Sequence, residues 1–67
     1  MKNRYKLFVE KSDSRLLEYV LINPDGRIIE TGNRTIKDIS SIGFTFNAVI
    51  NFISQNKFNQ IMKGISK

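Results

Sequence analysis

The sequence predicts an α+β fold: a three-stranded antiparallel meander followed by two or three helices packed on one sheet face (βββαα). Three observations predict it. Residues 1–33 contain three strand-like segments separated by turn sequences, and residues 34–67 place apolar residues at helical spacing. The length of 67 residues fits a single domain, 1–67, with a small core. We therefore expect a β-meander at 1–33 and a helical half at 34–67.

Two strands are predicted at the beginning of the chain. The segment RYKLFVE, residues 4–10, alternates apolar and polar side chains, as a strand with one buried face does. The polar segment KSDSR at 11–15 is expected to form a turn. The second strand, LLEYVLIN at 16–23, is rich in residues that favour β structure.

The segment NPDG at 23–26 predicts a tight turn between the second and third strands. Pro24 fixes φ at the first central position, and Gly26 takes the left-handed conformation that side chains disfavour. A returning strand, RIIETG at 27–32, follows such a turn. The three strands together form the meander, with the second strand in the middle.

The expected register pairs Glu10 with Leu16 and Asn23 with Arg27. It gathers apolar and aromatic side chains on one face: Tyr5, Leu7, Val9, Leu17, Tyr19, Leu21 and Ile29. It leaves a mixed face that solvent can tolerate: Lys6, Phe8, Glu10, Leu16, Glu18, Val20, Ile22, Ile28 and Glu30. Because a slip of one residue would exchange the two faces, this separation supports the register.

A first helix is predicted to follow Thr35, which forms a capping box with Asp38. In such a box the hydroxyl accepts from the third helical amide, and the carboxylate bonds back to the cap amide. Isoleucines recur at intervals of three, at positions 36, 39 and 42. The helix is expected to stop at Gly43, with Phe44 in the core.

Thr45 is the predicted cap of a further helical stretch. Its apolar stripe comprises Val49, Ile50, Phe52, Ile53, Phe58, Ile61, Met62 and Ile65. The polar residues SQNK at 54–57 either divide this stretch into two helices or form one polar turn within a single helix. The sequence alone does not decide between these two arrangements of residues 45–66.

The side chains that most catalytic and metal sites require are missing. The chain has no His and no Cys, and its four glycines are too scattered to form a phosphate-binding loop. In the predicted register Glu18 and Glu30 are diagonal neighbours, so a hydrolytic or metal-binding pair is conceivable, but a solvated edge pair is the preferred interpretation. We expect no enzyme, no catalytic residue, no metal, no cofactor and no small-molecule substrate.

Charge is distributed unevenly along the chain. Residues 1–33 carry six basic and five acidic side chains, whereas residues 34–67 carry five basic and one acidic, and no carboxylate side chain follows Asp38. Such a surface suits a polyanion, because each neutralised phosphate releases a counterion. The alternative is that a small protein needs net charge, here +5, to stay soluble.

Residues 35–53 have the outline of a helix-turn-helix, with Gly43 in the turn and branched apolar residues after it. The motif prefers a small residue where Ile39 stands. Residues 45–54 would be the helix that enters a DNA groove. The predicted base contacts are Thr45, Asn47, Asn51 and Ser54, and the predicted phosphate contacts are Arg34, Lys37, Lys57 and Lys63. In the alternative interpretation, Thr45 is only a cap and the asparagines are only solvated.

The segment INPDGRIIETGNRTIKDISSIGFTFNAVINFI, residues 22–53, resembles the nuclease-associated modular DNA-binding domains of phage homing endonucleases and similar small phage proteins. The matching positions are Asp25, Gly26, Ile29, Thr35, Ile36, Gly43, Val49 and Ile53. The resemblance covers about half of the chain and implies a hairpin that leads into a short helix-turn-helix. It also implies DNA binding without catalysis.

A second hypothesis is a phage-encoded stoichiometric inhibitor of a host defence or polymerase protein, of the anti-CRISPR or anti-restriction type, that acts by protein contact. Its docking surface would be the apolar part of the mixed sheet face and one exposed aromatic residue: Phe8, Leu16, Val20, Ile22, Ile28 and Phe46. The mixed face could instead form a homodimer. A third option is an RNA-binding component, but such chains usually carry more Arg, so DNA is favoured over RNA.

No apolar run approaches the roughly 20 residues that cross a bilayer, and residues 1–10 lack an apolar block of signal-peptide length. A small secreted domain would usually carry disulfides, and this chain has no cysteine. We therefore expect a cytoplasmic protein with no membrane contact, whose partner is nucleic acid or a host protein.

Overall fold

The computed structural model describes the backbone of residues 4–65 and the side chains of residues 4–64. Its elements are β1 (Lys6–Glu10), β2 (Leu17–Ile22), β3 (Ile28–Arg34), α1 (Ile36–Phe46), β4 (Val49–Ile53) and α2 (Gln55–Ile65). Neither helix of the described chain has the length and apolar character that crossing a membrane requires.

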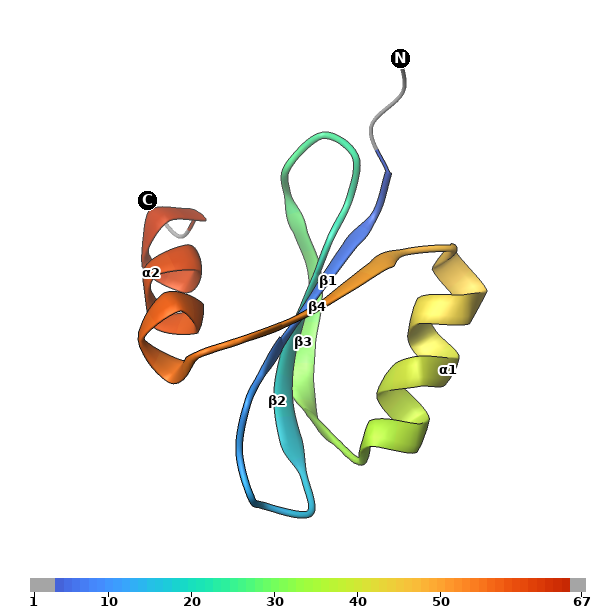
Figure 1. The fold of residues 1–67 in the computed structure, drawn as a ribbon. Coiled ribbons are helices and arrows are strands. Elements are labelled where there is room, and N and C mark those ends of the chain that lie inside the picture. Colours follow the sequence, from blue (N-terminus) through green and yellow to red (C-terminus); the bar gives the residue numbers. More distant parts are fainter. Residues whose placement is uncertain (1–3, 66–67) are drawn as a thin grey trace.

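The four strands form one sheet in the order β3-β2-β1-β4. β1 and β3 each pair antiparallel with β2, while β4 pairs parallel with β1. Figure 1 shows α1 and α2 on opposite sides of this sheet, so the fold has three layers. The predicted three-stranded meander with all helices on one face is therefore wrong. The half of the chain predicted to be helical contributes a fourth strand, and each sheet face receives one helix.

β4 replaces the helix predicted at residues 45–54. Its five residues, VINFI, are mainly β-branched or aromatic and favour a short strand. At its start, the amide of Val49 donates to the Tyr5 carbonyl at 3.0 Å. At its end, the Ile53 carbonyl accepts from the amide of Lys11 at 2.8 Å. Pairing with β1, which lies far away in the sequence, thus decides the conformation of this segment.

α1 begins as predicted and ends later than predicted. The Thr35 hydroxyl accepts from the amide of Asp38 at 3.3 Å, which confirms the predicted N-cap. The helix continues through Gly43 and ends at Asn47, whose φ of 52° and ψ of 43° lie in the left-handed region. Thr45 is therefore not a cap. It lies inside α1, where its hydroxyl donates at 2.9 Å to a carbonyl one turn earlier.

The pairing of β1 with β2 differs from the predicted register by two residues. Val9 lies opposite Tyr19, so the connection between the strands is longer than expected. Because side chains alternate with period two, this shift leaves each residue on its predicted face. The turn after β2 is confirmed by Gly26, whose φ is +91°.

A β-bulge changes the faces of β3. Ile22 pairs with Ile28, but the next pair joins Leu21 to Glu30, so one extra residue, Ile29, is left in β3. Glu30 consequently shares a face with Leu21 beneath α1. The predicted pair of Glu18 and Glu30 on one face is therefore wrong, and Ile29 is 45% exposed instead of buried.

The sheet face under α1 carries the larger core cluster: buried Leu7, Val9, Tyr19, Leu21 and Ile39, with partly buried Tyr5, Leu17, Ile42, Phe46, Ala48 and Ile50. Phe46 packs on Tyr5 with ring centroids 5.1 Å apart. Phe44, predicted to be in the core, is 90% exposed. The predicted positions of Phe44 and Phe46 are thus reversed, since residues two apart lie on opposite sides of a helix.

The opposite sheet face, predicted to meet solvent, is covered by α2. Its cluster contains buried Val20, Ile22 and Phe58, with partly buried Phe8, Ile28, Ile53, Ile61 and Met62. The apolar residues of α2 are spaced for one side of a helix, and Phe58 is its most deeply buried side chain. Each face of the sheet therefore packs against one helix and contributes to the core.

Candidate nucleic-acid interface

Residues 35–53 do not form a helix-turn-helix. The segment comprises α1, a short connection and β4. The predicted DNA-reading helix at 45–54 is wrong, and its four polar residues lie in different elements. Thr45 is in the last turn of α1, Asn47 caps α1, Asn51 is in the middle of β4 and Ser54 precedes α2.

Asn47 and Ser54 have structural roles at helix ends. The backbone and side-chain oxygens of Asn47 accept from the Arg4 guanidinium at 3.1 and 3.3 Å. The Ser54 hydroxyl accepts from the amide of Lys57 at 3.2 Å. The Ser54 carbonyl accepts from the amide of Phe58 at 2.9 Å, within the first turn of α2. Both polar side chains are therefore engaged within the protein.

The four predicted phosphate contacts do not share one surface. Lys37 lies on α1, whereas Lys57 and Lys63 lie on α2, and the two helices cover opposite sheet faces (Figure 1). Arg34 ends β3 on the α1 side, where its Nε donates to the Tyr19 hydroxyl at 3.1 Å. Among the four, Lys57 and Lys63 alone share an element.

α2 carries an acid-free polar surface, which we call the α2 outer face. Its exposed members are Gln55, Asn56, Lys57, Asn59, Gln60 and Lys63. The sequence interpretation missed its amides because it placed the DNA-reading helix at residues 45–54 and left the arrangement of residues 45–66 open. The spacing of Phe58, Ile61 and Met62 was the available signal, since these apolar positions define the polar positions between them.

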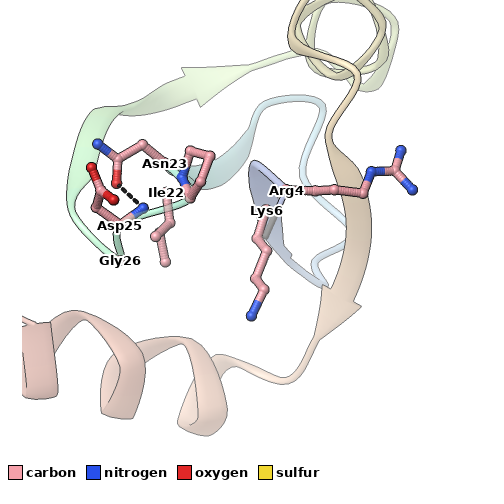
Figure 2. A pocket seen from close by; sticks show the side chains of 7 residues that line it. Arg4, Lys6, Ile22, Asn23, Asp25 and Gly26 are labelled. Atoms are coloured by element: carbon pink, nitrogen blue, oxygen red, sulfur yellow. Dashed lines mark hydrogen bonds between the residues drawn. The ribbon is translucent and has the colours of Figure 1, made fainter. Parts of the chain in front are cut away.

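Lys6 of β1 adds a cation on the same side of the sheet. It alternates with buried Leu7, which faces α1, so it shares the α2 side with Phe8. Figure 2 shows the Lys6 side chain directed toward α2. The α2 side of the molecule thus combines lysine ammonium groups with side-chain amides, which can donate and accept hydrogen bonds.

A hollow of about 250 Å³ lies between the start of β1 and the turn after β2, and is lined by Arg4, Lys6, Ile22, Asn23, Pro24, Asp25 and Gly26 (Figure 2). Its loop is internally bonded, because Asn23 Oδ1 accepts from the amides of Asp25 and Arg27 at 3.0 and 2.9 Å. Arg4 points away from the loop in Figure 2. Over residues 4–64, no group of three or more carboxylate, imidazole or thiol side chains could hold a metal ion. The hollow therefore contains no metal-binding group of this kind among its described residues.

Two carboxylates lie opposite each other at the far end of the α2 side. Extending the pairing of Val9 with Tyr19 by one step brings Glu10 opposite Glu18. Desolvation by neighbouring atoms raises the pKa of Glu10, and the charge of Glu18 and a hydrogen bond with it raise it further. This end of the surface repels a polyanion, whereas the end near Lys6 attracts one.

The Tyr19 hydroxyl joins β2 to β3 on the α1 side. It donates to Glu30 Oε2 at 2.5 Å and accepts from Arg34 Nε at 3.1 Å. Burial raises the pKa of Tyr19, and the bond to Glu30 acts in the same direction, so the hydroxyl stays protonated. The Tyr19 ring also lies against Gly32, where an added Cβ would be 3.4 Å from the ring. These bonds link β2 to β3.

The protein-interface residues predicted for the inhibitor hypothesis are mostly covered. Val20 and Ile22 are buried, Phe8 and Ile28 are half-buried under α2, and Phe46 is half-buried against Tyr5. Leu16 is 49% exposed. Most of the predicted docking face is therefore covered, since α2 was not expected to lie on it. The other large exposed apolar residues are Ile29, Ile36, Phe44, Val49 and Phe52.

Comparison of the chain with family models, curated proteins and solved structures finds no match. The resemblance to homing-endonuclease modules stays a prediction that these comparisons do not test.

Proposed function

We propose that this is a small non-enzymatic binding protein whose ligand is nucleic acid, contacted through the α2 outer face. The observation that supports the proposal is the acid-free, lysine- and amide-bearing surface of α2, in a chain of net charge +5. Lysines contribute affinity through phosphates, and Asn or Gln contributes selectivity through base edges. Lys57 is the proposed phosphate contact, and Asn59 and Gln60 are the proposed base contacts.

Duplex DNA is the favoured ligand because the proposed contact element is a helix. An α-helix fits the major groove of B-form DNA, where Asn and Gln can bond adenine in a bidentate manner. The major groove of A-form RNA is too narrow to admit side chains on a helix. The 11 residues of α2 span about 16 Å at 1.5 Å per residue, which suits a few base pairs.

A salt titration with duplex DNA tests the proposal. The logarithm of the binding constant should fall linearly with the logarithm of salt concentration, by about 0.9 for each phosphate contacted. Lys57→Gln should weaken binding and reduce this slope by about 0.9. Lys37→Gln removes the same charge from α1, on the other side of the sheet, and is the matched control. Equal effects of the two substitutions, or a flat salt response, contradict the proposal.

A second candidate function, binding of a host protein in the manner of an inhibitor, is favoured by Phe44. This side chain is 90% exposed on the outer side of α1, away from α2. Solvent-exposed aromatic residues are enriched at the centres of protein interfaces. Phe44→Ser would then abolish capture of the host protein while leaving DNA binding unchanged. If Phe44→Ser retains both capture of the host protein and DNA binding, this candidate function is excluded.

A further inference from the structure

The outer edge of β4 is open to pairing. β4 is the terminal strand in the order β3-β2-β1-β4. The amide of Val49 and the carbonyl of Ile53 bond to the β1 side. In a parallel ladder every second residue directs both backbone groups to the same neighbour. Ile50 and Phe52 therefore direct their N–H and C=O groups away from the sheet.

The two edges of the sheet differ in how they discourage pairing. β3 carries a bulge, the glycine Gly32 and the charged residues Glu30 and Arg34, all of which oppose edge-to-edge association. β4 carries no charge, Pro or Gly, and its register with β1 is unbroken. Its side chains remain accessible, with Val49 40% and Phe52 47% exposed. β4 is thus the edge suited to pair with another strand.

We propose that β4 pairs antiparallel with the β4 of a second copy of this chain, about a two-fold axis at Asn51, to form a continuous eight-stranded sheet. Ile50 of each copy then lies opposite Phe52 of the other copy. Each such pair exchanges two backbone hydrogen bonds, so all four outward groups on each strand become bonded. This inference does not depend on the proposed nucleic-acid function.

Neighbouring registers are excluded by bonds already present. A two-fold axis at Ile50 would require the amide of Ala48, which donates to the Gly43 carbonyl at 2.8 Å. An axis at Phe52 would require the carbonyl of Ser54, which accepts from Phe58 at 2.9 Å in the first turn of α2. The axis at Asn51 uses only backbone groups that have no partner in the described chain. The five residues of β4 are therefore self-complementary in one register.

The side chains of β4 also match in this register. Antiparallel partners lie on the same face, so exposed Phe52 contacts Ile50 of the second copy on the α1 side. On the α2 side, exposed Val49 contacts Ile53 of the second copy. The two Asn51 side chains meet at the axis, where their amides can bond to each other, and a central Asn pair fixes register. No charged side chain lies in the paired strands.

Sedimentation equilibrium of the wild-type protein from about 1 μM to about 1 mM tests the association. The expected result is an apparent mass that rises with concentration from 7.8 kDa toward twice that value. Hydrogen exchange should show protected Ile50 and Phe52 amides only at dimer concentrations, a readout that needs no variant. The proposal is overturned if the protein is a monomer throughout this range, or if both amides exchange as fast at high protein concentration as at low concentration. A protein that stays monomeric because its β4 pairs with a strand of another protein also overturns the proposal.

The register is tested with a single cysteine, because the native chain has none. Asn51→Cys should give a disulfide-linked dimer with oxidised glutathione, since Cα atoms of a non-hydrogen-bonded antiparallel pair are about 4.5 Å apart. Thr31→Cys, exposed on the opposite edge strand β3, is the matched control and should remain monomeric on denaturing gels. Equal cross-linking of the two variants overturns the register.

Charge substitution gives an independent test of the same contact. Asn51→Asp and Asn51→Lys should each be monomeric alone, and an equimolar mixture should form a heterodimer. Thr31→Asp should leave dimerisation unchanged. A dimer that tolerates both Asn51 substitutions must use another surface, which overturns the proposal.

Discussion

Gly43 of α1 lies directly against Ile50 of β4. A Cβ added at Gly43 would be 2.6 Å from Cδ1 and 3.0 Å from Cγ1 of Ile50. The glycine therefore serves close packing between the helix and the sheet, and not a turn between two helices. This contact sets the distance between α1 and β4, the strand that the sequence interpretation missed.

Gly43→Ala should destabilise the protein by about 1 kcal/mol. The gain in helix propensity, about 1 kcal/mol, is outweighed by overpacking against Ile50, which typically costs about 1–3 kcal/mol. Adding Ile50→Val, which removes the clashing methyl group, should recover most of the loss in urea denaturation. Gly64→Ala, with no atom within 4 Å of its added Cβ, is the control and should be neutral or stabilising. If Gly43→Ala is equally destabilising with and without Ile50→Val, the proposed contact is contradicted.

Phe58→Ala should cost about 3–5 kcal/mol, because the ring is 2% exposed and anchors α2 to the sheet. A small domain of this size has little stability in reserve, so the variant is expected to be largely unfolded by circular dichroism at 25 °C or to lose α2. Phe44→Ala removes the same ring from a 90% exposed position and should change stability by less than about 0.5 kcal/mol. Similar losses in both variants would mean that α2 does not cover the sheet.

Glu18→Gln should stabilise the protein near neutral pH and have little effect in acid. The raised pKa of Glu10 means that the folded state binds this proton more tightly than the unfolded state. Stability is therefore lost as pH rises above the ordinary Glu value of 4.5 toward the raised pKa. Desolvation, the largest cause of the raised pKa, remains in Glu18→Gln, and removing the Glu18 charge relieves the part of the loss that this charge causes. Denaturation midpoints at about pH 3 and about pH 7 measure the effect.

Asp13→Asn is the matched control for Glu18→Gln, since it removes one negative charge from the exposed connection between β1 and β2. A neutral-pH stabilisation of the same size in this variant would assign the effect to net charge and not to the Glu10–Glu18 pair.

Asn47→Ala should destabilise the protein by about 1–2 kcal/mol, whereas Asn47→Gly should be tolerated. The left-handed backbone at this position, φ 52°, disfavours a side chain that cannot bond locally. Asn47→Gly should also retain DNA binding, because this residue caps α1 and does not read bases. If Asn47→Gly keeps its fold but loses DNA binding, Asn47 belongs to the nucleic-acid interface.

The strands β1 to β3, the turn at Gly26 and the cap at Thr35 were predictable because their signals are local. Alternation, turn residues and a capping hydroxyl act over a few neighbouring residues. β4 was not predictable in this way, since a five-residue apolar run fits a strand or a helix stripe equally, and pairing with β1 decided between them. Asn47 was a local signal for a helix end before Val49, because Asn can adopt the left-handed conformation that often follows a helix.

The candidate sites were harder to predict because they depend on which face each helix covers. A bulge of one residue transferred Glu30 to the α1 side, and no sequence signal marked its position. Lys57, for which the sequence left a helix or a break between helices open, is exposed on α2. Its grouping with Lys37 was wrong, since that required both helices on one side of the sheet.

Whether α2 presents the nucleic-acid surface can be measured by titrating the isotope-labelled protein with duplex DNA at low salt and following amide chemical shifts. We expect saturable shifts at Asn56, Lys57, Asn59 and Gln60, with none at the outer residues of α1 such as Lys37 and Phe44. Shifts confined to α1, or no saturable shift anywhere, would contradict this expectation.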